Sequence, residues 1–264
     1  MPDDKGGSDR RDMMNAGIEI RVEPDETAAL QAAADVLMET VRSALATAGC
    51  ASIAISGGNT PRGMHRLLAR PPYAAKISWD RVHLFWADER MVPYEDPASN
   101  FGAARADFLE NLPRPPAGVH PIPAAGDPEV AARRYEEDLR QYFRQLNLTD
   151  PIFDLICLGL GADGHTASLF PESPVLNEQR RWAAAWKGGA PEVWRITLTL
   201  SVLNRAHRIL FLVTGEGKAA AVRHVLGGSW PVLPAQQVCP PAGQTTWVLD
   251  RAAASLLSHS LFSV

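Results

Sequence analysis

A histidine two residues after an aspartate is the pair best suited to acid–base chemistry. His165 follows Asp163-Gly164, a few residues beyond an apolar run that ends at Leu158. A histidine titrates near neutral pH, so one held at the end of a strand can act as a general base. A hydrogen-bonded structural histidine would fit the same position equally well. Asp163 would either orient His165 or shape the loop, and the sequence does not separate these two roles.

A small polar loop forms a predicted anion-binding site. The segment Ser56–Thr60 precedes Pro61, which fits the first position of a helix with Thr60 as its cap. Unpaired backbone N–H groups and the helix dipole both favour an anion there. The loop has no lysine and no Walker A pattern, so the balancing positive charge is expected from Arg195 and Lys218. For each of these residues the alternative is a solvated surface charge.

Two further polar loops, 88–100 and 214–218, also follow apolar runs. Asp88 and Glu89 are expected to orient neighbouring groups or to meet solvent. Arg90 would contact the substrate or pair with these carboxylates. In open parallel sheets, ligands bind outside the carboxyl ends of the strands, so four polar loops at that edge favour a binding site.

Other motifs and residues that could take part in catalysis or cofactor binding lack the sequence context that such roles require. Ser168 lacks the GxSxG elbow of a serine hydrolase, so a serine nucleophile is not expected. Residues 159–164 match GxGxxG, but the acidic residue that dinucleotide sites carry about 20 residues later is replaced by Arg180-Arg181-Trp182. The remaining histidines fall inside predicted elements or in loops and are interpreted as structural: His65, His83, His120, His207, His224 and His259.

Strands and helices alternate along the chain. Apolar residues at three- and four-residue steps predict a helix from near Asp25 to Gly49, and a charged helix with one apolar stripe over Pro128–Leu146. Further helices are predicted after Pro61, up to Leu226 and over Arg251–Leu257. Strands are predicted at Ala51–Ile55, Val82–Ala87, Phe153–Leu158, Ile196–Leu200 (half-buried), Arg208–Val213 and Thr245–Leu249. This order predicts an α/β fold with an open, mostly parallel sheet and helices on both faces, with Leu112–Pro123 and Gly227–Gly243 as surface loops.

Composition narrows the class of protein. The chain has 264 residues, a formal net charge of −4 and three widely spaced cysteines, so bulk-charge binding of nucleic acid and a zinc ribbon are not expected. It has no secretory signal pattern and no apolar window long enough for a membrane span, so a cytoplasmic location is expected. Residues 1–17 are predicted to be a disordered polar tail, and residues 18–264 a single catalytic α/β domain.

The motifs together resemble those of the 6-phosphogluconolactonase family. The resemblance runs from about Ile18 to the C-terminus, in the family's order, with Asn59 where the family commonly has serine. The SGGxTP-like loop is Ser56-Gly57-Gly58-Asn59-Thr60-Pro61, and the DERxVP…SN-like segment is Asp88-Glu89-Arg90-Met91-Val92-Pro93 with Ser99-Asn100. The GxGxDGHTASLFP-like signature is Gly159-Leu160-Gly161-Ala162-Asp163-Gly164-His165-Thr166-Ala167-Ser168-Leu169-Phe170-Pro171. Later segments similar to RxTxT and GxxK are Arg195-Ile196-Thr197-Leu198-Thr199 and Gly215-Glu216-Gly217-Lys218.

This resemblance implies hydrolysis of 6-phospho-D-glucono-1,5-lactone to 6-phospho-D-gluconate, the second step of the oxidative pentose phosphate pathway. It also implies a Rossmann-like fold shared with glucosamine-6-phosphate deaminases and ribose-5-phosphate isomerases, without an organic cofactor or a catalytic metal. His165, Asp163 and Arg90 are the expected catalytic residues, and residues 56–60 with Arg195 and Lys218 the expected phosphate site. Further site candidates are Asp88, Glu89, Gly161 and Gly164.

Two alternative functions belong to other classes. A glucosamine-6-phosphate deaminase/isomerase also carries a DGH loop, but its loop continues with a further acidic residue, whereas His165 here is followed by Thr-Ala-Ser-Leu-Phe-Pro. A non-catalytic sugar-phosphate sensor would usually carry a helix-turn-helix, which the 17-residue tail is too short to hold. The expected partner is a phosphorylated sugar lactone rather than nucleic acid or membrane, bound by a monomer or small homo-oligomer.

Overall fold

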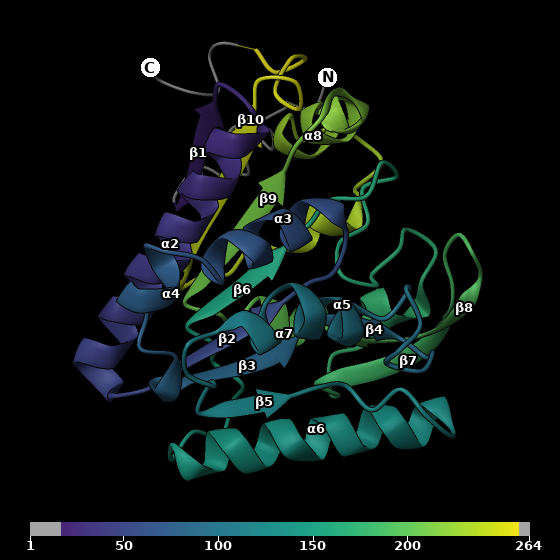
Figure 1. The fold of residues 1–264 in the computed structure, drawn as a ribbon. Coiled ribbons are helices and arrows are strands. Elements are labelled where there is room, and N and C mark those ends of the chain that lie inside the picture. The colour runs from purple at the N-terminus through teal and green to yellow at the C-terminus, as the bar shows by residue number, and fades with distance from the viewer. Residues whose placement is uncertain (1–16, 259–264) are drawn as a thin grey trace.

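The computed structural model describes residues 17–258, so nearly all of the predicted tail and His259 lie outside the described residues. Within residues 17–258, seven parallel strands form the main sheet, in the order β1-β10-β9-β6-β2-β3-β5 (Figure 1). They are β1 (Ile18–Glu23), β2 (Ala51–Ile55), β3 (Val82–Trp86), β5 (Gly118–His120), β6 (Leu155–Leu158), β9 (Arg208–Val213) and β10 (Gln244–Asp250). The predicted mostly parallel α/β sheet is confirmed.

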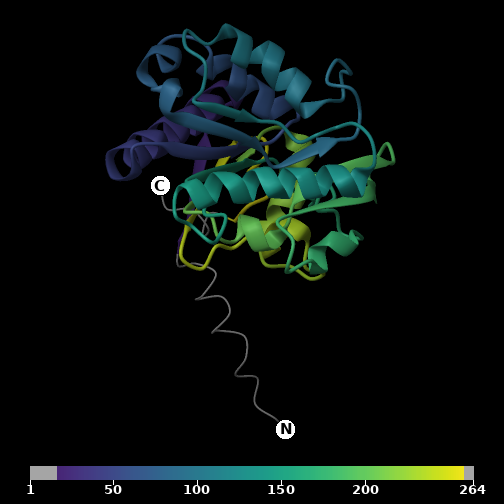
Figure 2. The same ribbon diagram turned by 90° about the horizontal axis from the view of Figure 1, so that it is seen from below.

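Helices cover the main sheet (Figures 1 and 2). They are α2 (Glu26–Ala48), α3 (Asn59–Leu68), α4 (Tyr73–Lys76), α5 (Asn100–Asp107), α6 (Pro128–Gln145), α7 (Leu200–Leu203) and α8 (Ala219–Leu226). Short 3₁₀ turns cover Trp79–Arg81, Leu109–Asn111, Pro174–Asn177, Glu216–Lys218 and Pro234–Gln237. Helix α2 begins after the capping carboxylate of Asp25 and ends at Gly49, whose left-handed backbone accommodates the turn. None of the helices within residues 17–258 is long and apolar enough to cross a membrane.

A second, antiparallel sheet was not predicted. It pairs β4 (Asp88–Arg90) with β8 (Val193–Leu198) and β8 with β7 (Ala183–Gly188). The segment 88–90 is therefore a strand rather than part of a loop. Residues 195–198 of β8 are buried rather than half-buried, since β8 lies between two strands and against the core.

Three smaller expectations were wrong. Residues 251–257 form successive turns instead of a helix, because Ser255 and Leu257 donate to carbonyls three residues back and no continuous series of α-helical bonds forms. The segment 112–123 contains the edge strand β5 in addition to loop. Helix α3 begins at Asn59 with Gly58 as its N-cap, so Thr60 lies inside the first turn and is not the cap.

The strand order explains where a site must form. From β2 the chain proceeds to β3 and β5 on one side, whereas from β6 it proceeds to β9 and β10 on the other. The crevice between β2 and β6 is therefore the point at which the winding of the sheet reverses, and ligands bind at such points, outside the carboxyl ends of the strands. The loops that follow β2 and β6 are 56–60 and 159–166.

His65 on α3 makes stability depend on pH. Its ring is buried against Phe108, and neither ring nitrogen has a hydrogen-bond partner within the described part of the chain. Burial lowers the pKa of His65 from 6.5 to about 4. The unfolded chain therefore takes up a proton as the pH falls below about 6.5, whereas the folded protein does so only near pH 4. The stability present above pH 6.5 is progressively lost across this window, by on the order of 3 kcal/mol.

Replacing His65 with leucine is expected to make the free energy of unfolding less dependent on pH between about 6.5 and 4. Urea denaturation of wild type and His65→Leu across this range measures the change in slope. The exposed His207 provides the matched variant, His207→Leu, which should retain the wild-type slope. An unchanged slope in His65→Leu would show that His65 does not remain neutral in the folded protein.

Candidate active site

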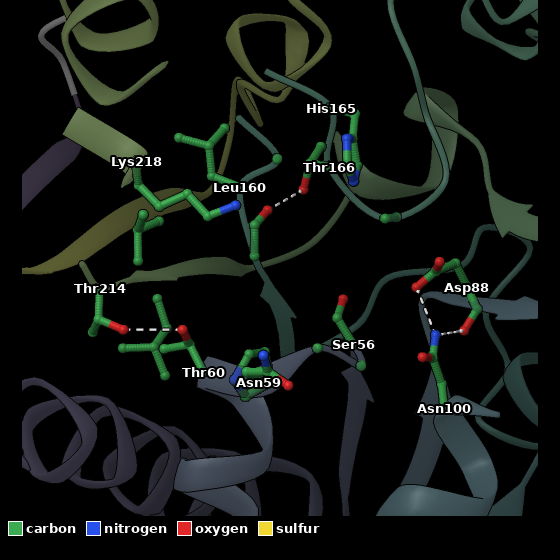
Figure 3. A pocket seen from close by; sticks show the side chains of 18 of the residues that line it. Ser56, Asn59, Thr60, Asp88, Asn100, Leu160, His165, Thr166, Thr214 and Lys218 are labelled. Carbon is green, nitrogen blue, oxygen red and sulfur yellow. Dashed lines mark hydrogen bonds between the residues drawn. The ribbon is translucent and has the colours of Figure 1, made fainter. Parts of the chain in front are cut away.

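The four predicted loops meet in one pocket of about 250 Å³ at the carboxyl edge of the sheet (Figure 3). The pocket contains most of the predicted site residues: Ser56, Gly57, Gly58, Asn59, Thr60, Asp88, Arg90, Gly161, His165, Arg195 and Lys218. Glu89, Asp163 and Gly164 support it from outside its lining. Lys218, Thr60 and Thr214 lie on one side, and His165 and Asp88 on the other (Figure 3).

His165 is held by Asp163 and remains open to the pocket. Its ring nitrogen Nδ1 lies 2.5 Å from Oδ1 of Asp163, which also accepts the backbone N–H of His165. Partial burial opposes ionisation of Asp163, but the nearby His165 and its hydrogen bonds outweigh that effect and lower the pKa of Asp163. An ionised carboxylate only accepts hydrogen bonds, so Nδ1 carries the proton and Nε2 is left as the basic nitrogen. Asp163 thus orients His165, in addition to its place in the loop.

Glycines at two positions of this loop make the pair possible. A Cβ on Gly161 would overlap the imidazole of His165 and crowd the carboxylate of Asp163. Gly164 has a φ of +81°, and a side chain there would collide with Leu233. The N–H of Gly161 also donates to the carbonyl of His165. The glycines therefore serve the close approach of backbone and side chains, not the binding of a dinucleotide.

The substitution Gly161→Ala is expected to lower kcat at least tenfold, because the new methyl group displaces the His165 ring from its productive position. Gly159→Ala is a matched control in the same loop, since nothing lies within 4 Å of a Cβ built there. Steady-state kinetics and thermal melting of both variants make the comparison. Equal kcat values for the two variants would contradict the inferred tight packing of Gly161 on His165.

Strand β4 carries two buried carboxylates, Asp88, which lines the pocket, and Glu89, which lies behind the lining. Asp88 accepts a hydrogen bond from Ser168 Oγ at 2.6 Å and one from Asn100 Nδ2 at 3.2 Å. Ser168 is fully buried and its hydroxyl is committed to Asp88, so its setting does not suit a nucleophile. Glu89 accepts the backbone N–H groups of Asn100 and Phe101 and thereby anchors the start of α5. Burial raises the pKa of Glu89, although these hydrogen bonds oppose the effect.

The loop 56–60 has the features of an anion site. Helix α3 begins within it without a side-chain cap, so its first backbone N–H groups have no intrahelical partner. Thr60 Oγ1 lies 3.0 Å from Thr214 Oγ1, which joins this loop to the one after β9. Ser56 Oγ donates its hydrogen to the carbonyl of Cys157. The Ser56 hydroxyl therefore stabilises the loop, whereas the sequence predicted that it would donate to an anion.

Three cationic side chains line the pocket: Arg90, Arg195 and Lys218. Within residues 17–258, none of their nitrogens lies within 4 Å of a carboxylate oxygen, so none of them forms an ion pair. Arg90 and Arg195 are cross-strand neighbours on β4 and β8. Burial and then the charge of Arg90 lower the pKa of Arg195, against the opposing effect of Asp88. Arg195 Nε donates to the carbonyl of Gly188 and Arg90 Nη1 to that of Ala98. Positive charge that has no carboxylate partner favours an anionic ligand.

Asn100 and Thr214 are among the pocket residues that were absent from the predicted site. Asn100 links Asp88 to Arg90, whose Nη1 donates to Asn100 Oδ1 at 3.0 Å. A Cβ on Gly57 would overlap the Asn100 amide, so the two loops fit closely. The Ser99-Asn100 element of the motif was the available signal for Asn100. The available signal for Thr214 was its place at the start of the predicted polar loop 214–218, directly after a predicted strand.

Known proteins are similar to this chain in both sequence and fold. A family model described as glucosamine-6-phosphate isomerases/6-phosphogluconolactonase matches residues 24–247. A 6-phosphogluconolactonase from Synechocystis is 40% identical over 220 residues, 81% of this chain and 87% of that protein. The structure of a 6-phosphogluconolactonase from Trypanosoma cruzi superposes with a TM-score of 0.80 and 28% identity, over 91% of this chain and 97% of that one. A monomeric glucosamine-6-phosphate deaminase shares the fold, with a TM-score of 0.72 and 22% identity over 90% and 99% of the two chains.

Proposed function

The chain belongs to the glucosamine-6-phosphate isomerase/6-phosphogluconolactonase family, and we propose that it hydrolyses 6-phospho-D-glucono-1,5-lactone to 6-phospho-D-gluconate. The observation that carries this proposal is a carboxylate-oriented histidine that shares one small pocket with three unpaired cations. The named relatives support the same reaction. A pocket of about 250 Å³ suits one sugar phosphate rather than a dinucleotide.

We propose that the phosphate of the substrate binds at the start of α3. Asn59 and Thr60 in the first turn of α3 lie on one side of the pocket with the ammonium of Lys218 (Figure 3), and Arg195, next to Arg90 in the pocket lining, adds a second positive charge to the pocket. Binding the phosphate there directs the lactone ring across the pocket toward His165 (Figure 3). The free energy gained at this remote group is used to orient the carbonyl carbon.

His165 acts as the general base in the proposed reaction. Its Nε2 takes a proton from water as the water oxygen bonds to the lactone carbonyl carbon, and the ionised Asp163 stabilises the imidazolium that forms. The tetrahedral oxyanion is stabilised by Arg90 or by loop N–H groups. The bond from this carbon to the ring oxygen then breaks, and the imidazolium returns its proton to that oxygen. The new carboxyl group ionises, so the reaction uses one water and needs no covalent intermediate.

Direct assay of both reactions distinguishes this proposal from its rival. The purified protein is expected to accelerate the opening of freshly prepared 6-phospho-D-glucono-1,5-lactone above the spontaneous rate, which is subtracted with a protein-free control. Glucosamine 6-phosphate should release no ammonia. Ammonia release without lactone hydrolysis would assign the deaminase reaction, and phosphate-sugar binding without either reaction would indicate a sensor.

The remaining attributes are also proposals. We infer that the enzyme works without an organic cofactor or metal, since every step above uses groups of the chain and water. A cytoplasmic location, a monomeric or small homo-oligomeric state and the absence of nucleic-acid partners stay predictions. A relative from rice is described as chloroplastic.

A further inference from the structure

We propose that Phe170 is a positioning residue that holds the imidazole of His165 in its reactive orientation, an inference that rests on the proposed function of His165. The Phe170 and His165 rings are stacked, with their centroids 4.1 Å apart and an angle of 21° between their planes. This near-parallel stack is closer than the roughly 4.5–7 Å centroid separation typical of aromatic pairs, so the two ring faces are in direct contact. Phe170 does not line the pocket, so it acts through His165 rather than on the substrate.

The hydrogen bond that His165 donates to Asp163 leaves one motion of the imidazole uncontrolled. A single contact at Nδ1 fixes one edge of the imidazole but still permits the ring to tilt about that contact. The side chain of His165 is 30% exposed, so packing restrains it only in part. A flat ring stacked against one imidazole face opposes such tilting and thereby fixes the direction of Nε2.

Phe170 is itself held from the second sheet. Its ring packs against Trp186 of β7, with the two ring centroids 5.5 Å apart. Trp186 Nε1 in turn donates to the carbonyl of Ser168. The guanidinium of Arg195 lies 5.2 Å from the centre of the Phe170 ring, within the range of a cation–π contact. Arg195 keeps its own anchor at the carbonyl of Gly188, so its position does not depend on Phe170 alone.

The second sheet, which the sequence did not predict, contributes to the site through Phe170. Strands β7 and β8 present Trp186 and Arg195 at paired positions of the same ladder, and both contact Phe170. The aromatic ring lies between this sheet and the general base. The sheet consequently positions His165 through Phe170 while it supplies Arg195 to the pocket.

Phe170→Leu, which removes the flat ring, tests the proposal. We expect kcat for the phosphorylated lactone to fall on the order of 10- to 100-fold, with KM changed less than about threefold. Phe170→Tyr retains the aromatic face and should keep most of kcat. Phe101→Leu is the matched control, since Phe101 is also half-buried and packs on the aromatic rings of Trp86 and Tyr94 rather than on His165.

Two readouts separate positioning from general loss of structure. In a His165→Ala background, Phe170→Leu should cause no further loss of kcat, because no imidazole remains to be oriented. In NMR spectra, the His165 ring protons should show the upfield ring-current shift of a stacked phenyl ring in wild type and lose it in Phe170→Leu. The His165 signals are assigned by their absence from His165→Ala. The NMR test is independent of activity, so it remains decisive even if the lactone is not the substrate.

The proposal is overturned if Phe170→Leu keeps the kcat of Phe101→Leu. It is equally overturned if Phe170→Leu lowers kcat by the same factor with and without His165, or if the ring-current shift is absent from wild type.

Discussion

Replacing His165 with alanine is expected to lower kcat by about 10²- to 10⁴-fold, the usual range for a lost general base. Asp163 keeps the proton of the imidazole on Nδ1, so Nε2 is the nitrogen that receives a proton from the attacking water. Without it, water must attack the lactone unaided. The proposed phosphate contacts lie on the other side of the pocket, so KM should change much less than kcat.

Steady-state rates above spontaneous hydrolysis test this expectation. His207→Ala is the control, since His207 is exposed and does not line the pocket. A near-wild-type kcat in His165→Ala would remove His165 from the reaction.

Replacing Lys218 with alanine is expected to reduce kcat/KM for the phosphorylated lactone by about 10- to 100-fold. A hydrogen bond to a charged group contributes roughly 1.5–3 kcal/mol, which corresponds to this range. Lys218 lines the proposed phosphate side of the pocket and forms no ion pair within residues 17–258, so its charge is free for the ligand. Unphosphorylated gluconolactone lacks the phosphate that Lys218 is proposed to bind and should be hydrolysed equally by wild type and variant.

The ratio of kcat/KM for the two lactones is therefore the informative quantity. Lys76→Ala provides the control, because Lys76 is an exposed residue on α4 that does not line this pocket. Equal losses on both lactones in Lys218→Ala would mean that Lys218 supports the site without recognising phosphate.

Much of the main sheet could be predicted from the sequence because its strands are buried on both faces. Such strands appear as short apolar runs, as in Ala51–Ile55, where every residue is buried. The polar loops that follow these runs correctly indicated the carboxyl edge of the sheet. The two helices with strong apolar periodicity, α2 and α6, were also predicted within a residue or two of their observed ends.

The second sheet was missed because its pairing is between distant segments. Asp88–Arg90 is short and charged, and it becomes a strand only through its pairing with β8, about a hundred residues later in the sequence. The alternation in β1, with Ile18, Ile20 and Val22 between charged residues, was a usable signal that was not taken up. Strand β7 carries three consecutive alanines, which have little strand preference of their own.

Within the site, residue types could be predicted but their hydrogen bonds could not. The spacing of Asp163 and His165 allowed either an orienting or a loop-shaping role, and only the 2.5 Å contact to Nδ1 distinguishes them. Ser56 was expected to bind the anion, whereas its hydroxyl is used by Cys157, a partner about a hundred residues away. Contacts of this kind depend on tertiary packing and leave no local pattern in the sequence.

A single-turnover reaction in H₂¹⁸O, with enzyme in excess over 6-phospho-D-glucono-1,5-lactone, tests the central claim most directly. If His165 activates water for direct attack, ring opening is faster than in buffer alone, and the product of the first turnover carries one ¹⁸O in its new carboxylate. Mass spectrometry of the quenched product measures this label. A rate no faster than the spontaneous reaction, or a first-turnover product that contains only ¹⁶O because a carboxylate of the protein attacked, would contradict the account.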